Sequence, residues 1–347
     1  MTRRLAVPTV ALAAIAALAL SACGEKKEST AAPRTQPLTL VLDFFPNADH
    51  AGIYAAQARG LFRRQGLDVR IVTPPDPSSP LKLLQAGRAD LAISYEPELL
   101  LARDKGADVV SVAALVQRPL TSIMSVGKRA IARPAQLRDK RVGTAGIPYQ
   151  SAMLRAILER AGVDPGSVTE TNVGFNLVPA MLSGKVDATL GAFWNYEGVQ
   201  LRRQGKRPRI IRVDQAGVPT YSELVIAARA KELGPGGDKV RRFLRALAQG
   251  HELLRRDPAA GVDPLLAANP DLDRGLQTAA VRATLPVFFA DDRSKPWGYM
   301  QQGEWVLFAR WMLEHRLLDR TPDPVAALTN EFLPGQGLAS NGRTPGS

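Results

Sequence analysis

Aromatic rings and carboxylates occur together in short segments that directly follow strand-like runs of the chain. The rings are Phe44, Phe45, Tyr95, Tyr149, Phe193, Trp194 and Tyr196, and the carboxylates are Asp43, Glu96 and Glu197. Rings beside carboxylates suit a flat heterocycle that carries an exocyclic amine, because stacking contributes ~0.5–1.5 kcal/mol per aromatic pair and a carboxylate accepts hydrogen bonds from the amine. Asn47 offers a partner for a ring nitrogen. Core packing is the alternative role for each single ring, and it explains the whole set less well.

The same loops carry no positive charge. Lys and Arg are absent from 43–50, 94–98, 143–150 and 191–197, although the chain contains 45 of them. A strongly anionic ligand is therefore disfavoured. The backbone amides around Gly143 and Thr144, at the start of an expected helix, could still bind a carboxylate or phosphate, and a plain strand–helix turn is the alternative.

Other chemistries find no support in the sequence. The chain has one cysteine, which excludes a disulfide framework and any zinc or iron–sulfur site built from thiolates. No His-Glu-x-x-His, Gly-x-Ser-x-Gly or phosphate-loop pattern occurs. We therefore expect no metal, no cofactor and no catalysis. The net charge is 45 − 33 = +12, but the basic runs lie beside apolar faces and indicate a solvated surface rather than a nucleic-acid site.

The N-terminal segment has the pattern of a secretory leader. Arg3 and Arg4 precede an apolar run that is too short to span a bilayer, and Cys23 follows Leu20-Ser21-Ala22 as in a bacterial lipobox. We predict a signal peptide over 1–22, lipidation of Cys23, and a flexible tether over 23–37. The protein is thus expected at the cell membrane, lipid-anchored and facing outside the cytoplasm. The Gly- and Ser-rich residues 335–347 are expected to be disordered.

Between these ends, short apolar runs alternate with amphipathic patterns, which predicts an α/β fold with largely parallel strand pairing. Strands are expected at 38–42, 67–71, 91–93, 109–116, 141–143, 168–173 and 188–190, and helices at 50–65, 80–87, 98–105, 150–161, 178–183, 239–256, 272–285 and 304–317.

A weak internal repeat supports two similar halves. Leu84-x-x-Gly87-Arg88-Ala89-Asp90-x-x-Ile93 aligns with the segment 181–190, which has the same order of helix-ending Gly, basic residue, Asp and strand. Extended stretches at 120–126 and 222–227 are expected to cross between the halves. We predict one lobe from 38–121 plus 224–334 and a second from 124–221, with a ligand cleft between their strand ends.

These loops also resemble a known family. Asp43-Phe44-Phe45-Pro46-Asn47-Ala48-Asp49-His50 is similar to the opening motif of the pyrimidine-binding proteins of thiamine-precursor ABC importers, which share a fold with the fungal pyrimidine synthases and the sulfonate-binding proteins. The likeness continues through Gly87-x-Ala89-Asp90, Gly143-Thr144-x-Gly146 and Gly191-Ala192-Phe193-Trp194-Asn195-Tyr196-Glu197. Family members often have Trp where Phe44 or Phe45 stands here.

The resemblance implies a type 2 periplasmic-binding-protein fold and a non-enzymatic, monomeric lipoprotein that captures an aminopyrimidine for an ABC permease and its ATPase. The ligand residues that we predict are Asp43, Phe44, Phe45, Asn47, His50, Tyr95, Glu96, Gly143, Thr144, Tyr149, Phe193, Trp194, Asn195 and Glu197. Two alternatives remain: the same scaffold binding riboflavin or an alkyl sulfonate, and an enzyme like the fungal synthases, in which a histidine is consumed as substrate. His50 is the residue in question.

Overall fold

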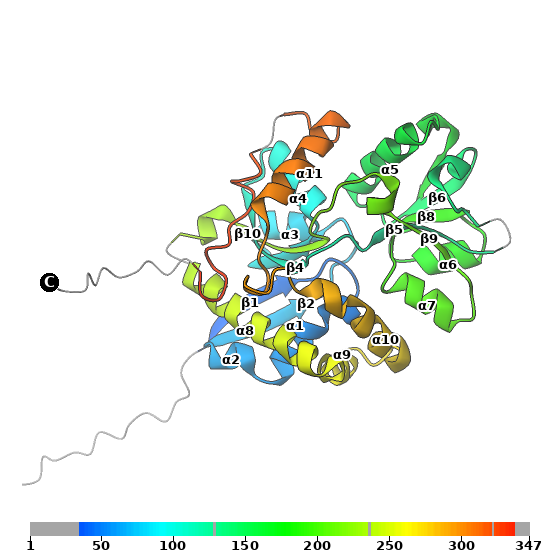
Figure 1. Cartoon of the computed structure of the whole chain (residues 1–347). Helices are drawn as coiled ribbons and strands as arrows, with labels where there is room; N and C mark the ends of the chain where they lie inside the picture. Colours follow the sequence, from blue (N-terminus) through cyan, green and yellow to red (C-terminus); the bar gives the residue numbers. More distant parts are fainter. Residues whose placement is uncertain (1–34, 128–129, 235–236, 321–322, 337–347) are drawn as a thin grey trace, which may run out of the picture. The chain divides into compact units, whose positions relative to one another are not determined.

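The computed structural model describes residues 35–127, 130–234, 237–320 and 323–336. Its core consists of two five-stranded sheets with helices packed around each of them (Figure 1). The predicted signal peptide over 1–22, Cys23 and the tether up to residue 34 lie outside the described residues, as does nearly all of the predicted tail over 335–347.

The first sheet has the strand order β2-β1-β3-β10-β4. Its strands are β2 (Leu67–Val72), β1 (Gln36–Val41), β3 (Leu91–Ser94), β10 (Leu224–Arg229) and β4 (Val109–Val116). Every residue of β3 and β4 is buried, which explains why these segments read as unbroken runs of mainly apolar residues rather than as alternating patterns.

The second sheet has the order β7-β6-β8-β5-β9. It comprises β7 (Thr169–Asn172), β6 (Arg141–Thr144), β8 (Ala188–Phe193), β5 (Thr121–Ser125) and β9 (Arg209–Arg212). The first sheet thus takes its strands from 36–116 and 224–229, and the second from 121–212. The exact lobe boundaries that we drew from the sequence, 38–121 plus 224–334 and 124–221, stay a prediction.

Helices flank both sheets (Figure 1). Those from the segments that build the first sheet are α1 (Ala51–Ala58), α2 (Leu61–Arg64), α3 (Pro80–Gln85), α4 (Glu96–Asp104), α8 (Gly237–Arg256), α9 (Val262–Ala268), α10 (Arg274–Thr284) and α11 (Gln302–Glu314), and those of the second are α5 (Pro148–Arg160), α6 (Leu177–Leu182) and α7 (Glu197–Arg203). Short 3₁₀ turns join several elements, including η1 (Ala48–His50) before α1.

The α/β fold class is confirmed, and several details of the prediction need correction. The pairing is not largely parallel, because β10 and β5 run antiparallel to both of their neighbours. These two strands follow the crossings between the sheets, so they enter against the direction of the strands beside them. The expected helix over 50–65 is two helices, since Gly60 adopts a left-handed φ of 64° between them. Strand β1 begins at Gln36, inside the predicted tether.

The two segments that cross between the sheets are joined by one carboxylate. Glu223, directly before β10, accepts the backbone N–H groups of Leu120 and Thr121 at 2.6 and 2.8 Å. It also accepts the hydroxyls of Thr121 and Tyr221 at 2.8 and 3.1 Å. Burial raises the pKa of Glu223 to about 7, although these donors act in the opposite direction. Glu223 therefore holds the start of β5 next to the start of β10.

The internal repeat has a structural cause. Asp90 accepts the backbone N–H of Thr39 in β1 at 2.7 Å, and the equivalent Asp187 accepts the N–H of Arg141 in β6 at 2.9 Å. The backbone N–H of each aspartate donates in return to the carbonyl of the same strand residue. In each sheet the aspartate thus aligns the strand that follows it with the strand that leads to the ligand-facing loops.

Replacement of Asp90 by Ala should destabilise the protein by about 1–2 kcal/mol, because the N–H of Thr39 loses its acceptor. Asp187→Ala should cost less, because Arg141 is exposed and water can replace the lost acceptor. Urea denaturation measures both, with Asp68→Ala on the exposed surface of β2 as the control. Unchanged unfolding midpoints for both variants would contradict this role of the repeat.

Candidate functional site

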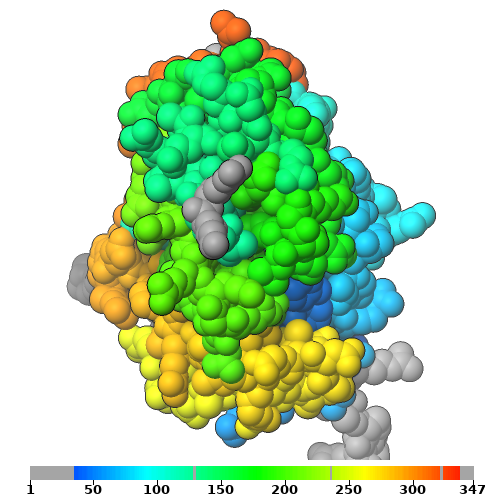
Figure 2. Space-filling model, turned by 90° about the vertical axis from the view of Figure 1, so that its right-hand side faces the viewer, coloured from blue at the N-terminus to red at the C-terminus, as the bar shows by residue number. Residues whose placement is uncertain are grey.

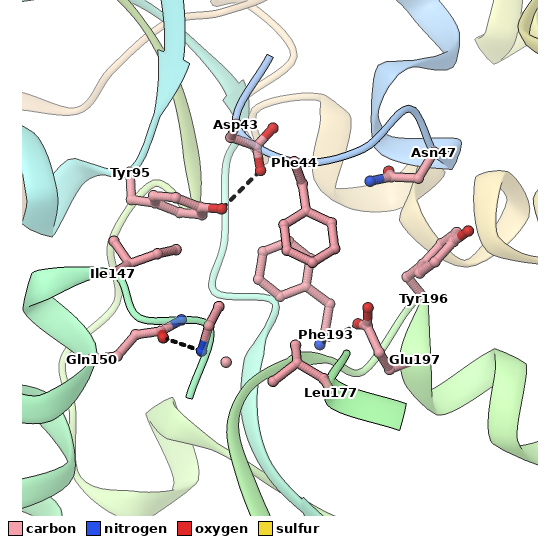
Figure 3. Close-up of a pocket in the computed structure, with 12 residues that line it drawn as sticks. Asp43, Phe44, Asn47, Tyr95, Ile147, Gln150, Leu177, Phe193, Tyr196 and Glu197 are labelled. Carbon is pink, nitrogen blue, oxygen red and sulfur yellow. Dashed lines mark hydrogen bonds between the residues drawn. The ribbon is translucent and has the colours of Figure 1, made fainter. Parts of the chain in front are cut away.

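A cavity lies between loops of the two sheets (Figure 3). Its lining consists of Asp43, Phe44, Asn47, Tyr95, Ala145, Ile147, Gln150, Leu177, Gly191, Phe193, Tyr196 and Glu197. The first four follow β1 and β3, and most of the others follow β6 and β8. The carboxyl ends of strands in α/β sheets are common ligand sites.

Asp43 is held from two sides. His50 Nδ1 accepts the backbone N–H of Asn47 at 3.2 Å, so the neutral imidazole carries its hydrogen on Nε2 and donates it to Asp43 Oδ1 at 2.8 Å. The Tyr95 hydroxyl donates to Asp43 Oδ2 at 2.8 Å (Figure 3). With both oxygens oriented by protein donors, Asp43 presents its remaining lone pairs in a fixed direction.

Asn47 ties this loop together. Its Oδ1 accepts the N–H of Asp49 at 2.8 Å, and its Nδ2 donates to the carbonyl of Phe45 at 3.0 Å. Asn47 thereby caps η1, the turn that leads into α1. Its Nδ2 carries a second hydrogen besides the one donated to Phe45, and Asn47 lines the cavity.

Glu197 provides the second carboxyl group of the cavity (Figure 3). It is the first residue of α7, and its Oε2 accepts the backbone N–H of Phe193 at 2.7 Å. Burial raises the pKa of Glu197 to about 7, and the negative charges of Asp49 and Asp43 add to this rise. Near neutral pH the group is thus close to the point at which it exchanges a proton.

Gln150 forms the wall opposite Glu197. Its Oε1 accepts the N–H of Ala145 at 2.8 Å (Figure 3), which leaves the Nε2 amide as a donor. Gly191 lies against this amide with a φ of 109°, and any Cβ there would collide with Gln150 Nε2. Glycine is required at this position for both reasons.

Aromatic rings fill the space between the carboxyl groups. Phe44 and Phe193 both line the cavity. Phe44 packs edge to face on Phe175, with 4.7 Å between the ring centres. The ring of Phe45 is tilted by 45° against that of Phe44, with 4.6 Å between the ring centres, and its centre lies 5.9 Å from that of Tyr196. These contacts fix the orientation of the exposed edge of Phe44.

Six of the fourteen predicted ligand residues line this cavity, namely Asp43, Phe44, Asn47, Tyr95, Phe193 and Glu197. Their contact with a ligand stays a prediction. The other eight, Phe45, His50, Glu96, Gly143, Thr144, Tyr149, Trp194 and Asn195, do not line it, because each is committed to other neighbours.

Four of these eight residues form hydrogen bonds with residues of other loops or elements. Glu96 accepts the N–H of Ser222 at 2.7 Å, and Trp194 Nε1 donates to the carbonyl of Pro119 at 3.0 Å. Asn195 bonds to Asp49 at 2.7 Å, and His50 bonds to Asp43 as described.

Three of the remaining four, Phe45, Tyr149 and Gly143, pack against neighbouring side chains, and the fourth, Thr144, forms a hydrogen bond. Phe45 packs in a tilted arrangement against Phe44, and the buried ring of Tyr149 packs on Tyr95 at 5.4 Å between centres. The hydroxyl of Thr144 donates to Glu170 at 3.1 Å. Gly143 lies inside β6, where a side chain would press on Val186 and Thr189.

The lining also includes Ala145, Ile147, Gln150, Leu177 and Gly191, which our predicted set left out. Gln150 had a detectable signal, since it is a polar residue in the first turn of a helix after a glycine-containing loop. Leu177 had none, because an apolar residue at the start of a helix is ordinary core. Tyr196 appeared among the rings noted in the sequence and does line the cavity.

The lining contains no Lys or Arg. Within 35–127, 130–234, 237–320 and 323–336 there is no group of three His, Cys, Asp or Glu side chains arranged to hold a metal ion. Over the same residues, no helix is long and apolar enough to cross a membrane.

The two sheets and the cavity between their strand ends define a periplasmic-binding-protein-like fold. The alkanesulfonate-binding protein SsuA of Xanthomonas axonopodis, bound to MOPS, superimposes with a TM-score of 0.67 at 18% identity, over 84% of this chain and 98% of that one. At this identity the likeness concerns the fold alone.

The chain belongs to the NMT1/THI5-like family, whose model matches residues 47–260. A formylaminopyrimidine-binding protein of Halalkalibacterium halodurans is 32% identical over 84% of this chain and 88% of its own. The 4-amino-5-hydroxymethyl-2-methylpyrimidine phosphate synthase THI13 of Saccharomyces cerevisiae is 25% identical over 86% and 88%. The family resemblance noted from the sequence is thus confirmed.

The raised pKa of Glu197 predicts a pH-dependent stability. The folded protein holds this proton up to about pH 7, whereas an unperturbed glutamate releases it near 4.5. The proton therefore stabilises the fold at low pH, and this contribution is lost as the pH rises from about 4.5 to 7. In Glu197→Gln the fall in unfolding free energy over this window should be shallower, by at most about 1.4 kcal/mol per pH unit.

Urea denaturation at pH 4.5, 5.5, 6.5 and 7.5 measures this slope. Glu159→Gln, on the exposed side of α5, is the control and should follow the parent. A Glu197→Gln protein whose stability falls as steeply as the parent's would show that Glu197 does not carry the proton.

Proposed function

We propose that this protein is an extracytoplasmic solute-binding protein of an ABC importer and that its ligand is a neutral aminopyrimidine precursor of thiamine. One observation carries the proposal: Asp43 and Glu197 enter a small, ring-lined cavity from different sheets, and no cation lines that cavity. Two carboxyl groups and flat rings match a single heterocycle with amine donors.

Recognition would use three kinds of contact. The ring of the ligand packs against the edges and faces of Phe44 and Phe193. Its exocyclic amine donates to a carboxyl oxygen of Glu197 or Asp43, in a site where the exclusion of water strengthens the interaction. The free amide hydrogens of Gln150 and Asn47 serve ring nitrogens or a substituent oxygen. These roles rest on the positions of the lining residues.

The alternative ligands fit this lining less well. An alkyl sulfonate is anionic, and two carboxyl groups without a Lys or Arg beside them oppose it. Riboflavin has three fused rings and a sugar-alcohol chain, whereas the rings of Phe44 and Phe193 already occupy the space between the two carboxyl groups of this cavity (Figure 3).

The surroundings of His50 favour a protein that binds its ligand without converting it. The relatives include both a binding protein and synthases. His50 is fully buried, bonds to Asp43 and the backbone of Asn47, and does not line the cavity. A histidine in that position orients Asp43 and is poorly placed for a reaction with a ligand in the cavity.

Titration calorimetry with Glu197→Gln tests the proposal. A hydrogen bond to a charged group is worth roughly 1.5–3 kcal/mol, so this variant should bind 4-amino-5-hydroxymethyl-2-methylpyrimidine or its formylamino analogue about 10- to 100-fold more weakly. Glu98→Gln is the matched control, since Glu98 is also buried, has a pKa raised to about 7 by burial, and lies outside the cavity lining.

The ligand panel adds riboflavin, taurine and sulfate, with binding expected only in the pyrimidine series. Tight binding of taurine would favour the sulfonate alternative, and formation of a new product on incubation would favour an enzyme. If Glu197→Gln binds like the parent while Asp43→Asn does not, the main anchor is Asp43. If neither variant changes the affinity, the pyrimidine site is elsewhere.

We also propose that the protein is anchored to the outer face of the cell membrane through Cys23, where it would deliver ligand to a permease coupled to an ATPase. The support is the leader over 1–22, the lipobox-like Leu20-Ser21-Ala22-Cys23, and the polar segment that follows. Cys23 is the only cysteine of the chain.

Cys23→Ala should leave the membrane fraction when expressed in its bacterial host, because a protein without acyl chains lacks the buried CH₂ groups that hold it there. Fractionation with immunoblotting measures this, and Ser29→Ala in the polar segment is the control. Processed Cys23→Ala protein that still sediments with membranes would contradict the anchor.

A further inference from the structure

We propose that Asp49, Asn195 and Thr284 form a latch that holds the two sheets' loops together over the cavity and so slows ligand release. The inference rests on the proposed binding function, and its residues act through closure rather than through contact with the ligand. None of the three lines the cavity.

The latch joins three distant parts of the chain. Asn195 follows β8 of the second sheet, Asp49 follows β1 of the first sheet, and Thr284 ends α10. Asn195 Nδ2 donates to Asp49 Oδ1 at 2.7 Å and to Thr284 Oγ1 at 2.6 Å. The one hydroxyl hydrogen of Thr284 has two acceptors in reach, Asp49 Oδ1 at 3.0 Å and the carbonyl of Ala280 at 2.9 Å. At most 1% of each residue is exposed, so water does not compete for these bonds.

Hydrogen bonds stabilise the contact between the two loops, while two buried oxygen atoms without partners destabilise it. Asp49 Oδ2 and Asn195 Oδ1 are buried and have no hydrogen-bond partner among the described residues. An unpaired buried polar atom costs free energy that hydration would recover. Separation of the sheets would break the two bonds of Asn195, to Asp49 and to Thr284, but expose both of these atoms to water. Because the free-energy gain from the bonds is partly offset by the cost of the unpaired atoms, the contact can open again when the ligand is delivered.

Each half of the latch is connected to the cavity. On the first sheet, the N–H of Asp49 donates to Asn47 Oδ1, and Asn47 lines the cavity. On the second sheet, Asn195 lies within the turn between Phe193 and Glu197, both of which line the cavity. A ligand that draws these two loops together therefore brings Asn195 to Asp49.

Helix α10 reinforces the contact. Two turns before Thr284, Gln277 Nε2 donates to the hydroxyl of Tyr196 at 3.0 Å, and Asp273 pairs with Arg203 of α7 at 3.6 Å. Figure 2 shows this side of the molecule, where the yellow segment of α9 and α10 lies against the green second-sheet segment. Helix α10 and its N-cap thus contact both the loop after β8 and helix α7.

Stopped-flow measurement of 4-amino-5-hydroxymethyl-2-methylpyrimidine binding distinguishes a residue that keeps the two loops closed from one that contacts the ligand. Asn195→Ala and Thr284→Val should raise the dissociation rate about tenfold and leave the association rate within about twofold, because the open form still admits the ligand. Thr284→Val keeps the shape of the side chain, so it serves if Asn195→Ala folds poorly. Asn269→Ala is the control, since that amide bonds to Leu265 within α9.

A second measurement needs no ligand. The full chain with Cys23→Ala carries spin labels at Asp68→Cys and Lys185→Cys, one exposed position near each sheet. Pulsed electron paramagnetic resonance then measures the distance between the two labels. Asn195→Ala should shift the distances of the free protein to longer values, whereas Asn269→Ala should not. If the parent fails to bind the pyrimidine, the proposed ligand is wrong and this shift still tests the latch. An unchanged distance distribution, or an unchanged dissociation rate in a parent that binds, overturns the latch.

Discussion

The structure depends on keeping two carboxyl groups, Asp43 and Glu197, buried in one small cavity with no cation beside them. Burial of a carboxyl group is costly unless protein donors satisfy it. His50 and Tyr95 supply those donors to Asp43, and the N–H of Phe193 supplies one to Glu197. The raised pKa of Glu197 records the part of this cost that the donors do not offset. An amine from a ligand would be the missing partner, and that is the physical basis of the proposed selectivity.

The fold brings the two carboxyl groups together from different sheets. Asp90 and Asp187 set the strands that lead into the loops, and Glu223 fixes the crossing segments next to each other. Asp49 and Asn195 then join the two loops directly. Carboxylates that accept backbone or side-chain amide hydrogens therefore recur where strands are aligned and where the two sheets are joined.

The sequence indicated the fold and part of the site, for reasons that particular residues make clear. Asp43 and Glu197 were recognisable because each comes just after a buried strand and beside aromatic rings. Within 191–197, however, Phe193, Tyr196 and Glu197 face the cavity while Trp194 and Asn195 turn away, and only the turn geometry decides this. Glu96 turns to Ser222, a partner 126 residues away. Gly60 divides an otherwise continuous helical pattern, and β9 was missed because arginines flank its two isoleucines.

A crystal structure of the protein with 4-amino-5-hydroxymethyl-2-methylpyrimidine tests the central claim most directly. The account predicts the ring next to Phe44 and Phe193, with its exocyclic amine within hydrogen-bonding distance of a carboxyl oxygen of Glu197 or Asp43. A pyrimidine bound outside this cavity, or one whose amine faces away from both carboxyl groups, would contradict it.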